Sequence, residues 1–260
     1  MRMRLQAVIL AATACFAQNL DTRVDIGGRK LHVLCMGTGS PTVILEAGMG
    51  DFSAAWMPVQ RRMASFTRVC SYDRAGLGDS DEPRERRVSA DTYVHDLQTL
   101  LADANITSPY VLVGHSMGGI LVRLYAKAYP ADVKGMVLVD SSHEPPPHQG
   151  FMGGMTGRDR LDFVNILTTA RDQHWTADIP LIVLARRRGD DELPPQSSPA
   201  RKAEIQRMNE DEQKDLASRS PRGKIVWVQN SGHYIQRDAS TLLVDSVHDV
   251  VIAARGEKNK

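Results

Sequence analysis

The fold of this chain is indicated most clearly by the segment Tyr110-Val-Leu-Val-Gly-His-Ser-Met-Gly-Gly119. The apolar run at its start is typical of a buried β-strand, and a helical pattern begins directly after Ser116. The stretch Gly114-His-Ser-Met-Gly118 therefore predicts a sharp turn from strand to helix, with the serine at its apex. Neighbouring backbone comes close on both sides of such a turn, and glycines remove the Cβ atoms that would clash. We expect the Ser116 hydroxyl to stand above the edge of the sheet.

At this position Ser116 is a candidate nucleophile. The helix that follows it directs free backbone N–H groups and the positive end of its dipole to the place where a substrate oxygen gains charge. A serine hydroxyl also needs a base. Among eight histidines, His233 is favoured, because it follows the last predicted strand and should reach the same sheet edge. His115 is adjacent to the serine, but we expect its side chain to point elsewhere, in a packing or pocket-lining role.

Short β-branched apolar runs alternate with helical patterns along the rest of the chain, which indicates an α/β fold with helices on both faces of a mostly parallel sheet. Eight strands are expected, at residues 22–26, 29–35, 42–46, 67–72, 110–114, 133–140, 180–185 and 224–229. Helices are expected at residues 55–65, 89–104, 117–129, 200–216 and 240–254. The first two strands flank Gly27-Gly28, a link suited to a hairpin, so the sheet should begin antiparallel.

The pattern is interrupted between residues 141 and 178 by prolines and glycines, with one helical stretch near residues 158–171. We interpret this segment as a short lid inserted after the sixth strand, within one domain of residues 18–260. The segment supplies Phe151, Met152, Met155, Phe163 and Trp175, apolar side chains that either line an acyl pocket or anchor the lid.

Composition limits the classes of function. The chain has 260 residues, of which 42% are hydrophobic and 24% charged, so it can build a core and is not expected to be disordered. With 32 Lys and Arg against 31 Asp and Glu, its formal charge of +1 provides no basic field for nucleic acid. A small neutral or apolar ligand fits better. Motifs for nucleotides or metals are missing, so we expect no cofactor and no metal. The oligomeric state is not indicated.

The first residues have the pattern of an export signal. Arg2 and Arg4 precede an apolar run at residues 5–14, which is too short to span a bilayer as a mature helix. We assign residues 1–17 to a signal peptide, cleaved after Ala14 or Ala17, and expect an exported protein, periplasmic or secreted, without a membrane span. As a second alternative, Cys15 is a lipoprotein acceptor, although the residue three positions before it is a small alanine.

Together these segments resemble the α/β-hydrolase superfamily, in its serine-nucleophile, esterase-like branch, over nearly the whole mature length. The resemblance is carried by Ile44-Leu-Glu-Ala-Gly-Met-Gly50, Val69-Cys-Ser-Tyr-Asp-Arg-Ala-Gly-Leu-Gly78, Gly114-His-Ser-Met-Gly118, Val137-Leu-Val-Asp140 and Ser231-Gly-His233. It implies an eight-stranded sheet whose second strand alone is antiparallel, a lid after strand six, and catalytic residues in the order serine, acid, histidine.

Two acids are candidates for the partner of His233. Asp140 ends strand six, whereas Asp190 follows strand seven and precedes Pro194 as in an Asp-x-x-x-Pro pattern of many relatives. The loop of Asp190 is highly charged, and an acid that orients histidine should be shielded. We favour Asp140 and keep Asp190 as the alternative.

The resemblance also implies an oxyanion hole built from the backbone N–H groups of Met49 and Met117. The loop histidine of many relatives is replaced by Ala47, but the amide donors do not depend on that side chain. Asp73 and Glu46 are expected to be structural, bonding loop amides.

Strands two and four are neighbours in this family, and Cys35 and Cys70 lie near their ends. An exported protein would oxidise the two thiols if their Cα atoms come within about 7 Å of each other. We therefore predict a disulfide between them.

The function implied is that of a serine esterase, which cleaves carboxylic esters of small, largely apolar substrates through an acyl-enzyme. Ser116 is the nucleophile, His233 the base and Asp140 the residue that orients it. Two alternatives stay open. The first is a small-ligand receptor with slow or no turnover on the same fold, and the second is an amidase, thioesterase or lactonase.

Overall fold

The computed structural model describes residues 19–144, 158–187 and 196–256. The expected signal peptide, Asp190 and the lid residues Phe151, Met152 and Met155 lie outside these ranges.

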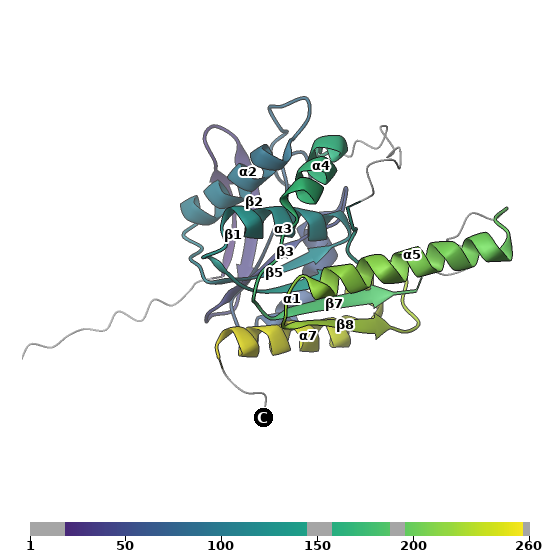
Figure 1. Ribbon diagram of the computed structural model, residues 1–260. Helices are drawn as coiled ribbons and strands as arrows, with labels where there is room; N and C mark the ends of the chain where they lie inside the picture. The colour runs from purple at the N-terminus through teal and green to yellow at the C-terminus, as the bar shows by residue number, and fades with distance from the viewer. Residues whose placement is uncertain (1–18, 145–157, 188–195, 257–260) are drawn as a thin grey trace, which may run out of the picture.

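An eight-stranded sheet runs through the molecule, as predicted (Figure 1). Its strands are β1 Leu20–Asp25, β2 Lys30–Met36, β3 Thr42–Glu46, β4 Val69–Tyr72, β5 Tyr110–His115, β6 Val133–Val139, β7 Leu181–Arg186 and β8 Gly223–Val228. Their order is β1-β2-β4-β3-β5-β6-β7-β8. Strand β2 is antiparallel to β1 and to β4, and all other neighbours are parallel. The carboxyl ends of β3 to β8 therefore meet at one edge.

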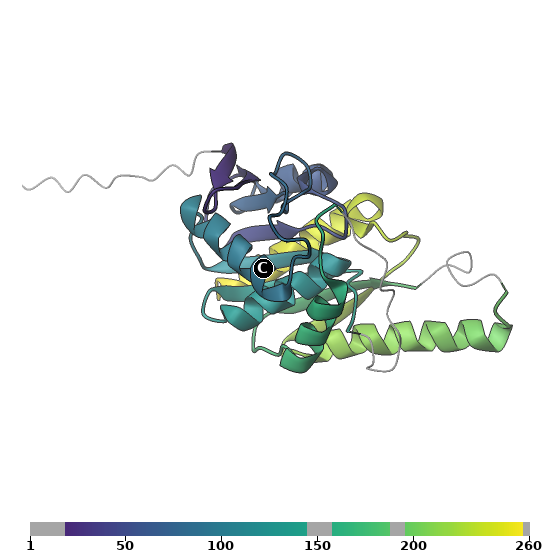
Figure 2. The same ribbon diagram turned by 90° about the horizontal axis from the view of Figure 1, so that it is seen from above.

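Helices cover both faces of the sheet (Figure 2). They are the 3-10 helix η1 Ser53–Trp56 and the α-helices α1 Met57–Met63, α2 Ala90–Asp103, α3 Met117–Ala128, α4 Phe163–Gln173, α5 Pro199–Ser218, α6 Ile235–Asp238 and α7 Ser240–Ala254. Helices α2 to α5 lie on one face, and α1, α6 and α7 lie on the other. The N-terminal half of α5 extends past the sheet in both views (Figures 1 and 2).

The central strands are mainly apolar because both of their faces are covered. Along β5, Val111 and Val113 point into the core under α7, whereas Leu112 points into the core under α3. All six residues of β5 are buried. Continuous burial of this kind is expected for parallel strands between two helical layers.

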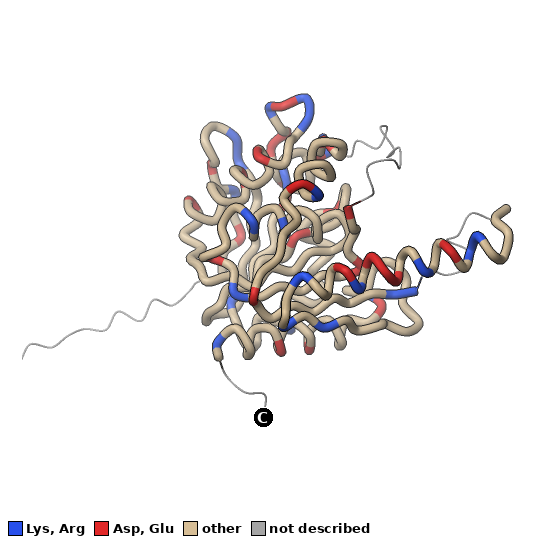
Figure 3. The backbone as a smooth tube through the Cα atoms, in the orientation of Figure 1, with Lys and Arg blue, Asp and Glu red and all other residues tan. Residues whose placement is uncertain are grey.

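A disulfide joins Cys35 to Cys70, which confirms the predicted pair. The two residues are direct partners in the register of β2 and β4, with their Cα atoms 4.0 Å apart. Among the described helices, none has the length and apolar character needed to cross a bilayer. Basic and acidic residues are interspersed along α5 rather than gathered by sign (Figure 3).

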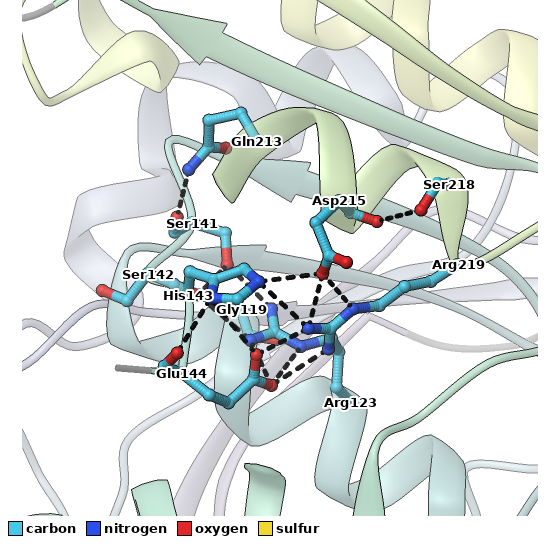
Figure 4. Close-up of polar contacts among 10 residues, drawn as sticks. All are labelled: Gly119, Arg123, Ser141, Ser142, His143, Glu144, Gln213, Asp215, Ser218 and Arg219. Atoms are coloured by element: carbon cyan, nitrogen blue, oxygen red, sulfur yellow. Dashed lines mark hydrogen bonds and ion pairs between the residues drawn. The ribbon is translucent and has the colours of Figure 1, made fainter. Parts of the chain in front are cut away.

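The chain after β6 is fastened by a buried ionic cluster, which we call the Glu144 cluster (Figure 4). Glu144 binds Arg123 of α3 at 2.9 Å and Arg219 at the end of α5 at 2.8 Å. Asp215 also binds Arg219, and it contacts His143 at 2.8 Å. Charges buried in this way need full pairing, which the cluster provides. It connects the base of the predicted lid to helices α3 and α5.

Two of the apolar side chains considered for an acyl pocket are buried in the hydrophobic core instead. Phe163 and Trp175 are only 6% and 3% exposed and belong to the core on the α2 to α5 side of the sheet. They anchor α4, because their burial holds this helix against the body of the protein.

Candidate active site

Ser116 sits at the turn between β5 and α3. Its backbone has φ 53° and ψ −121°, a conformation with positive φ that an L-residue adopts only at a cost in strain. The turn is held by its neighbours: the N–H of Ser116 donates to the carbonyl of Val139, and the N–H of Ser142 donates to the carbonyl of Ser116, both at 3.0 Å. The end of β6 and the residues just after it thus fix the position of the serine.

The glycines around this turn are required by close backbone contacts. A Cβ on Gly118 would lie 2.6 Å from the carbonyl oxygens of Ala47 and Glu46, and one on Gly114 would lie 2.6 Å from the carbonyl oxygen of Gly118. Such distances are too short for any side chain. Helix α3 therefore passes against the end of β3, which puts the loop after β3 beside Ser116.

Asp140 and His233 are brought together at the carboxyl edge of the sheet. Nδ1 of His233 lies 2.6 Å from Oδ2 of Asp140, although the two residues are 93 positions apart in the sequence. The side chain of Asp140 is 12% exposed and that of His233 is 40% exposed. The shielded acid and the accessible imidazole differ in the way that an orienting group and a base require.

Arg186, the last residue of β7, contributes to the same pair. Its Nε donates to Oδ2 of Asp140 at 2.8 Å. Burial alone would raise the pKa of Asp140, but the hydrogen bond with His233 and the charge of Arg186 together hold this pKa below its usual value. Asp140 is therefore a carboxylate at neutral pH. Sequence analysis did not single out Arg186, since it starts a charged run that is typical of a solvated loop.

His115 packs behind His233. The residue is 1% exposed, its ring centroid lies 4.6 Å from that of His233, and its Nε2 lies 2.9 Å from the carbonyl oxygen of His233. Burial is the main cause that lowers the pKa of His115 to about 4, and the nearby His233 adds to this effect. The ring is thus neutral, and Nε2 must carry the proton to donate to that carbonyl. It supports the backbone of His233, consistent with a packing role.

The loop after β3 contains Met49, and the first turn of α3 contains Met117. Met117 is the first residue of α3, whose N–H has no partner inside the helix. Among the described residues we find no acceptor for the N–H of Met49. An ideal Cβ on Gly48, the residue before it, would lie 3.4 Å from the Cβ of Ser116. Both amides are therefore donors near the serine.

Glu46 and Asp73 have different structural roles. Asp73 accepts the backbone N–H groups of Ser53 at 2.8 Å and Asp79 at 3.0 Å, as predicted. The expectation for Glu46 was wrong, because this fully buried carboxylate binds the hydroxyls of Tyr72 and Tyr93 and the guanidinium of Arg74 instead of loop amides. Burial raises the pKa of Glu46 even though these partners act in the opposite direction.

Within the described residues, one group of side chains has the spacing of a metal site: His32, Asp73 and Asp79. Nδ1 of His32 lies 3.0 Å from Oδ2 of Asp73, which also accepts the Asp79 N–H, and Asp21 contacts the other ring nitrogen of His32. These contacts account for the arrangement as a loop network between β1, β2 and the chain after β4.

Comparison with known proteins agrees with the fold. A family model described as the alpha/beta hydrolase fold matches residues 41–167, which include the loop after β3, the turn at Ser116 and the end of β6. This chain has the α/β-hydrolase fold. The sheet of this α/β hydrolase has the expected antiparallel second strand, so the resemblance drawn from the motifs is confirmed at the level of fold.

Curated relatives match only part of their own length. The uncharacterized protein YqjL of Bacillus subtilis (strain 168) is 38% identical over 104 residues, which are 40% of this chain and 41% of that protein. Epoxide hydrolase 4 of Mus musculus is 29% identical over 123 residues, which are 46% of this chain and 34% of that protein. The matched region thus spans less than half of either relative.

Solved structures extend the likeness over most of the fold. A thermophilic esterase from Thermogutta terrifontis, solved with malate bound, superposes with a TM-score of 0.66 at 17% identity. The match covers 90% of this chain and 99% of that one. At this identity the likeness establishes the fold, and the chemistry has to be argued from the site.

Proposed function

We propose that this α/β hydrolase is a serine esterase, with Ser116 as nucleophile, His233 as general base and Asp140 as the acid that orients it. The observation that carries the proposal is the bond between Nδ1 of His233 and the carboxylate of Asp140, at the edge where Ser116 forms the strained turn. With Nδ1 occupied, Nε2 is the ring nitrogen left for a substrate or a hydroxyl.

The reaction follows from these roles. Oγ of Ser116 adds to the ester carbonyl carbon, its proton passes to Nε2 of His233, and the carbonyl electron pair becomes an oxyanion bound by the N–H groups of Met49 and Met117. Collapse of this intermediate breaks the bond to the alcohol, which leaves with the proton from His233. Water then enters, gives a proton to His233 and releases the carboxylic acid from Ser116 by the same steps.

An ester is favoured over an epoxide by the residue at the turn. Relatives that open epoxides place an aspartate at the nucleophile position, whereas this chain has a serine there. The leaving alkoxide of an ester also needs less assistance than the amine of an amide. We therefore propose carboxylic esters of small, largely apolar molecules as the substrate class, with no cofactor.

We also propose that the protein is exported, periplasmic or secreted. The disulfide between Cys35 and Cys70 is compatible with an oxidising compartment. Mass spectrometry of protein recovered from the periplasm and the medium would test this, with an N-terminus after Ala14 or Ala17 as the expected result.

A fluorophosphonate probe tests the nucleophile. We expect stoichiometric labelling of the wild type, no labelling of Ser116→Ala and full labelling of Ser142→Ala, which removes a serine nearby in space. A panel of nitrophenyl esters of increasing acyl length should show steady turnover with a preference for short chains. Labelling retained by Ser116→Ala would refute the assignment, and one burst of nitrophenol without turnover would favour the receptor alternative.

A further inference from the structure

The loop after β3 is held by an arginine from another strand end. Arg74, just after β4, is 6% exposed, and its guanidinium donates to the carbonyl oxygen of Ala47 at 2.8 Å and to that of Gly48 at 2.7 Å. These two residues come directly before Met49. A planar guanidinium that binds two successive carbonyls fixes their directions as well as their positions.

The direction of the Gly48 carbonyl determines that of the Met49 N–H. Both groups belong to one trans peptide unit, in which C=O and N–H point to opposite sides. Because the carbonyl of Gly48 faces Arg74, the N–H of Met49 faces away from it. A flip of this peptide would turn a carbonyl oxygen, instead of a donor, toward the oxyanion.

Arg74 is itself immobilised by carboxylates. Its Nε and Nη2 both donate to Oδ2 of Asp159, at 3.0 Å and 2.7 Å, and its Nη1 binds Glu46. With the two carbonyls, these contacts use all five N–H donors of the guanidinium. Asp159 and Glu46 are each 1% exposed, so the anchor is shielded from water. The arginine therefore has little freedom to leave the carbonyls.

We propose that Arg74 is a positioning residue that holds the Gly48–Met49 peptide in the orientation where the Met49 N–H serves as an oxyanion donor, with Asp159 fixing Arg74. This inference rests on the proposed serine esterase function. The hydrogen bonds of Arg74 go to Glu46, Asp159 and the two loop carbonyls, so it acts through the peptide. Removal of the Arg74 side chain should weaken the stabilisation of the transition state and leave substrate binding nearly unchanged.

The experiment compares Arg74→Met, Arg74→Lys and Asp159→Asn with the wild type. Methionine keeps an apolar stem and loses every donor, and lysine supplies a charge without the fork that spans two carbonyls. We expect Arg74→Met to lower the acylation rate about 100-fold, as for loss of an oxyanion donor, with KM changed less than about threefold. Arg74→Lys and Asp159→Asn should give smaller losses of the same kind.

A trifluoromethyl ketone separates positioning from general stabilisation. Oγ of Ser116 adds to its carbonyl carbon, the proton goes to His233, and the oxygen becomes an anion in the oxyanion hole. Its affinity should fall in parallel with the acylation rate, while the affinity for a non-reactive ester analogue stays constant. Arg29→Met is the matched control, because Arg29 is also buried and doubly paired, but its partners are Glu85 and Asp96 instead of carbonyls in the loop after β3. It should leave all these values unchanged.

The residual dipolar coupling of the Met49 N–H reports its direction without any catalysis. We expect the value in Arg74→Met to change or average, and that in Arg29→Met to match the wild type. If Arg74→Met does not fold, Arg74→Lys and Asp159→Asn decide by the same readouts. An unchanged coupling and ketone affinity in the folded variants would overturn the role of Arg74. A wild type that neither adds to the ketone nor accepts fluorophosphonate would instead overturn the esterase function.

Discussion

His115 makes stability depend on pH in a defined window. Its folded pKa of about 4 lies below the usual value of about 6.5. Between these values the unfolded chain binds a proton that the folded protein does not, so stability is lost as pH falls through the window. For this residue, which is 1% exposed, linkage gives a loss of about 2 kcal/mol between pH 7 and pH 5.

Urea unfolding at pH 7 and pH 5 would measure this contribution. His115→Gln keeps an N–H donor for the His233 carbonyl. Its free energy of unfolding should fall by about 2 kcal/mol less than that of the wild type between pH 7 and pH 5. His248→Gln, a substitution in α7 that leaves His115 in place, serves as the control and should retain the wild-type dependence. Equal pH dependence in His115→Gln and wild type would contradict the buried neutral ring.

The acid at residue 140 can be tested by removing only its charge. Asp140→Asn should lower kcat/KM on a short ester by about 10³- to 10⁴-fold, because an amide stabilises neither the correct tautomer nor the charged form of His233. Asp96→Asn is a matched control, since Asp96 is also paired with a buried arginine and its side chain is 13% exposed. It should keep wild-type activity. A larger loss in Asp190→Asn than in Asp140→Asn would move the assignment to the strand-seven loop.

At the scale of elements, the strands could be predicted because their pattern has one cause. Parallel strands covered on both faces are built mainly of apolar residues, and β3, β5 and β7 are buried throughout. The short helix α6, by contrast, was not expected, because four residues are too few to establish a helical period. Its formation depends on packing against α1 and α7.

Contacts between elements explain what the sequence did not reveal about the site. Arg186 begins a charged run, yet as the last residue of β7 it lies beside the end of β6 and reaches Asp140. Arg74 was noted only as part of a family motif, and its two carbonyl partners come from the loop that follows β3, the strand beside β4. Strand adjacency, once assumed, could have suggested both. The direction of a peptide plane has no signal in residue types.

The disulfide between β2 and β4 acts on the unfolded chain. It closes a loop with a sequence separation of 35 residues, for which the chain-entropy model gives a stabilisation of about 3–4 kcal/mol. Cys35→Ala with Cys70→Ala should lower the free energy of unfolding by that amount in urea titrations. Dithiothreitol should bring the wild type close to the double variant and leave the variant unchanged. If dithiothreitol also changed the free energy of unfolding of the double variant, the effect would not come from the disulfide between Cys35 and Cys70.

At the scale of the whole molecule, the site depends on distant segments arriving at one edge. The end of β6 provides Asp140, and the Glu144 cluster fastens the chain just beyond it to α3 and α5 (Figure 4). Arg123 and Arg219 are 1% and 5% exposed; Glu144 compensates the charge of Arg123 and shares Arg219 with Asp215. Glu144→Gln should therefore destabilise the protein at pH 7 by about 3–5 kcal/mol, as measured by urea unfolding.

The size of the pH dependence distinguishes this cluster from ordinary surface pairs. Burial would raise the pKa of Glu144, but the charge of Arg123 and the hydrogen bond from Arg219 lower it well below its usual range. The stabilisation is thus fully present above the unfolded pKa of about 4.3 and is lost as pH falls toward the folded pKa. The difference in the free energy of unfolding between wild type and Glu144→Gln should become smaller below about pH 4.3. Glu85→Gln, whose side chain is 37% exposed in its pair with Arg29, should cost at most about 1 kcal/mol. If this difference between wild type and Glu144→Gln stays constant as the pH is lowered, Glu144 stabilises the protein by packing and not by charge.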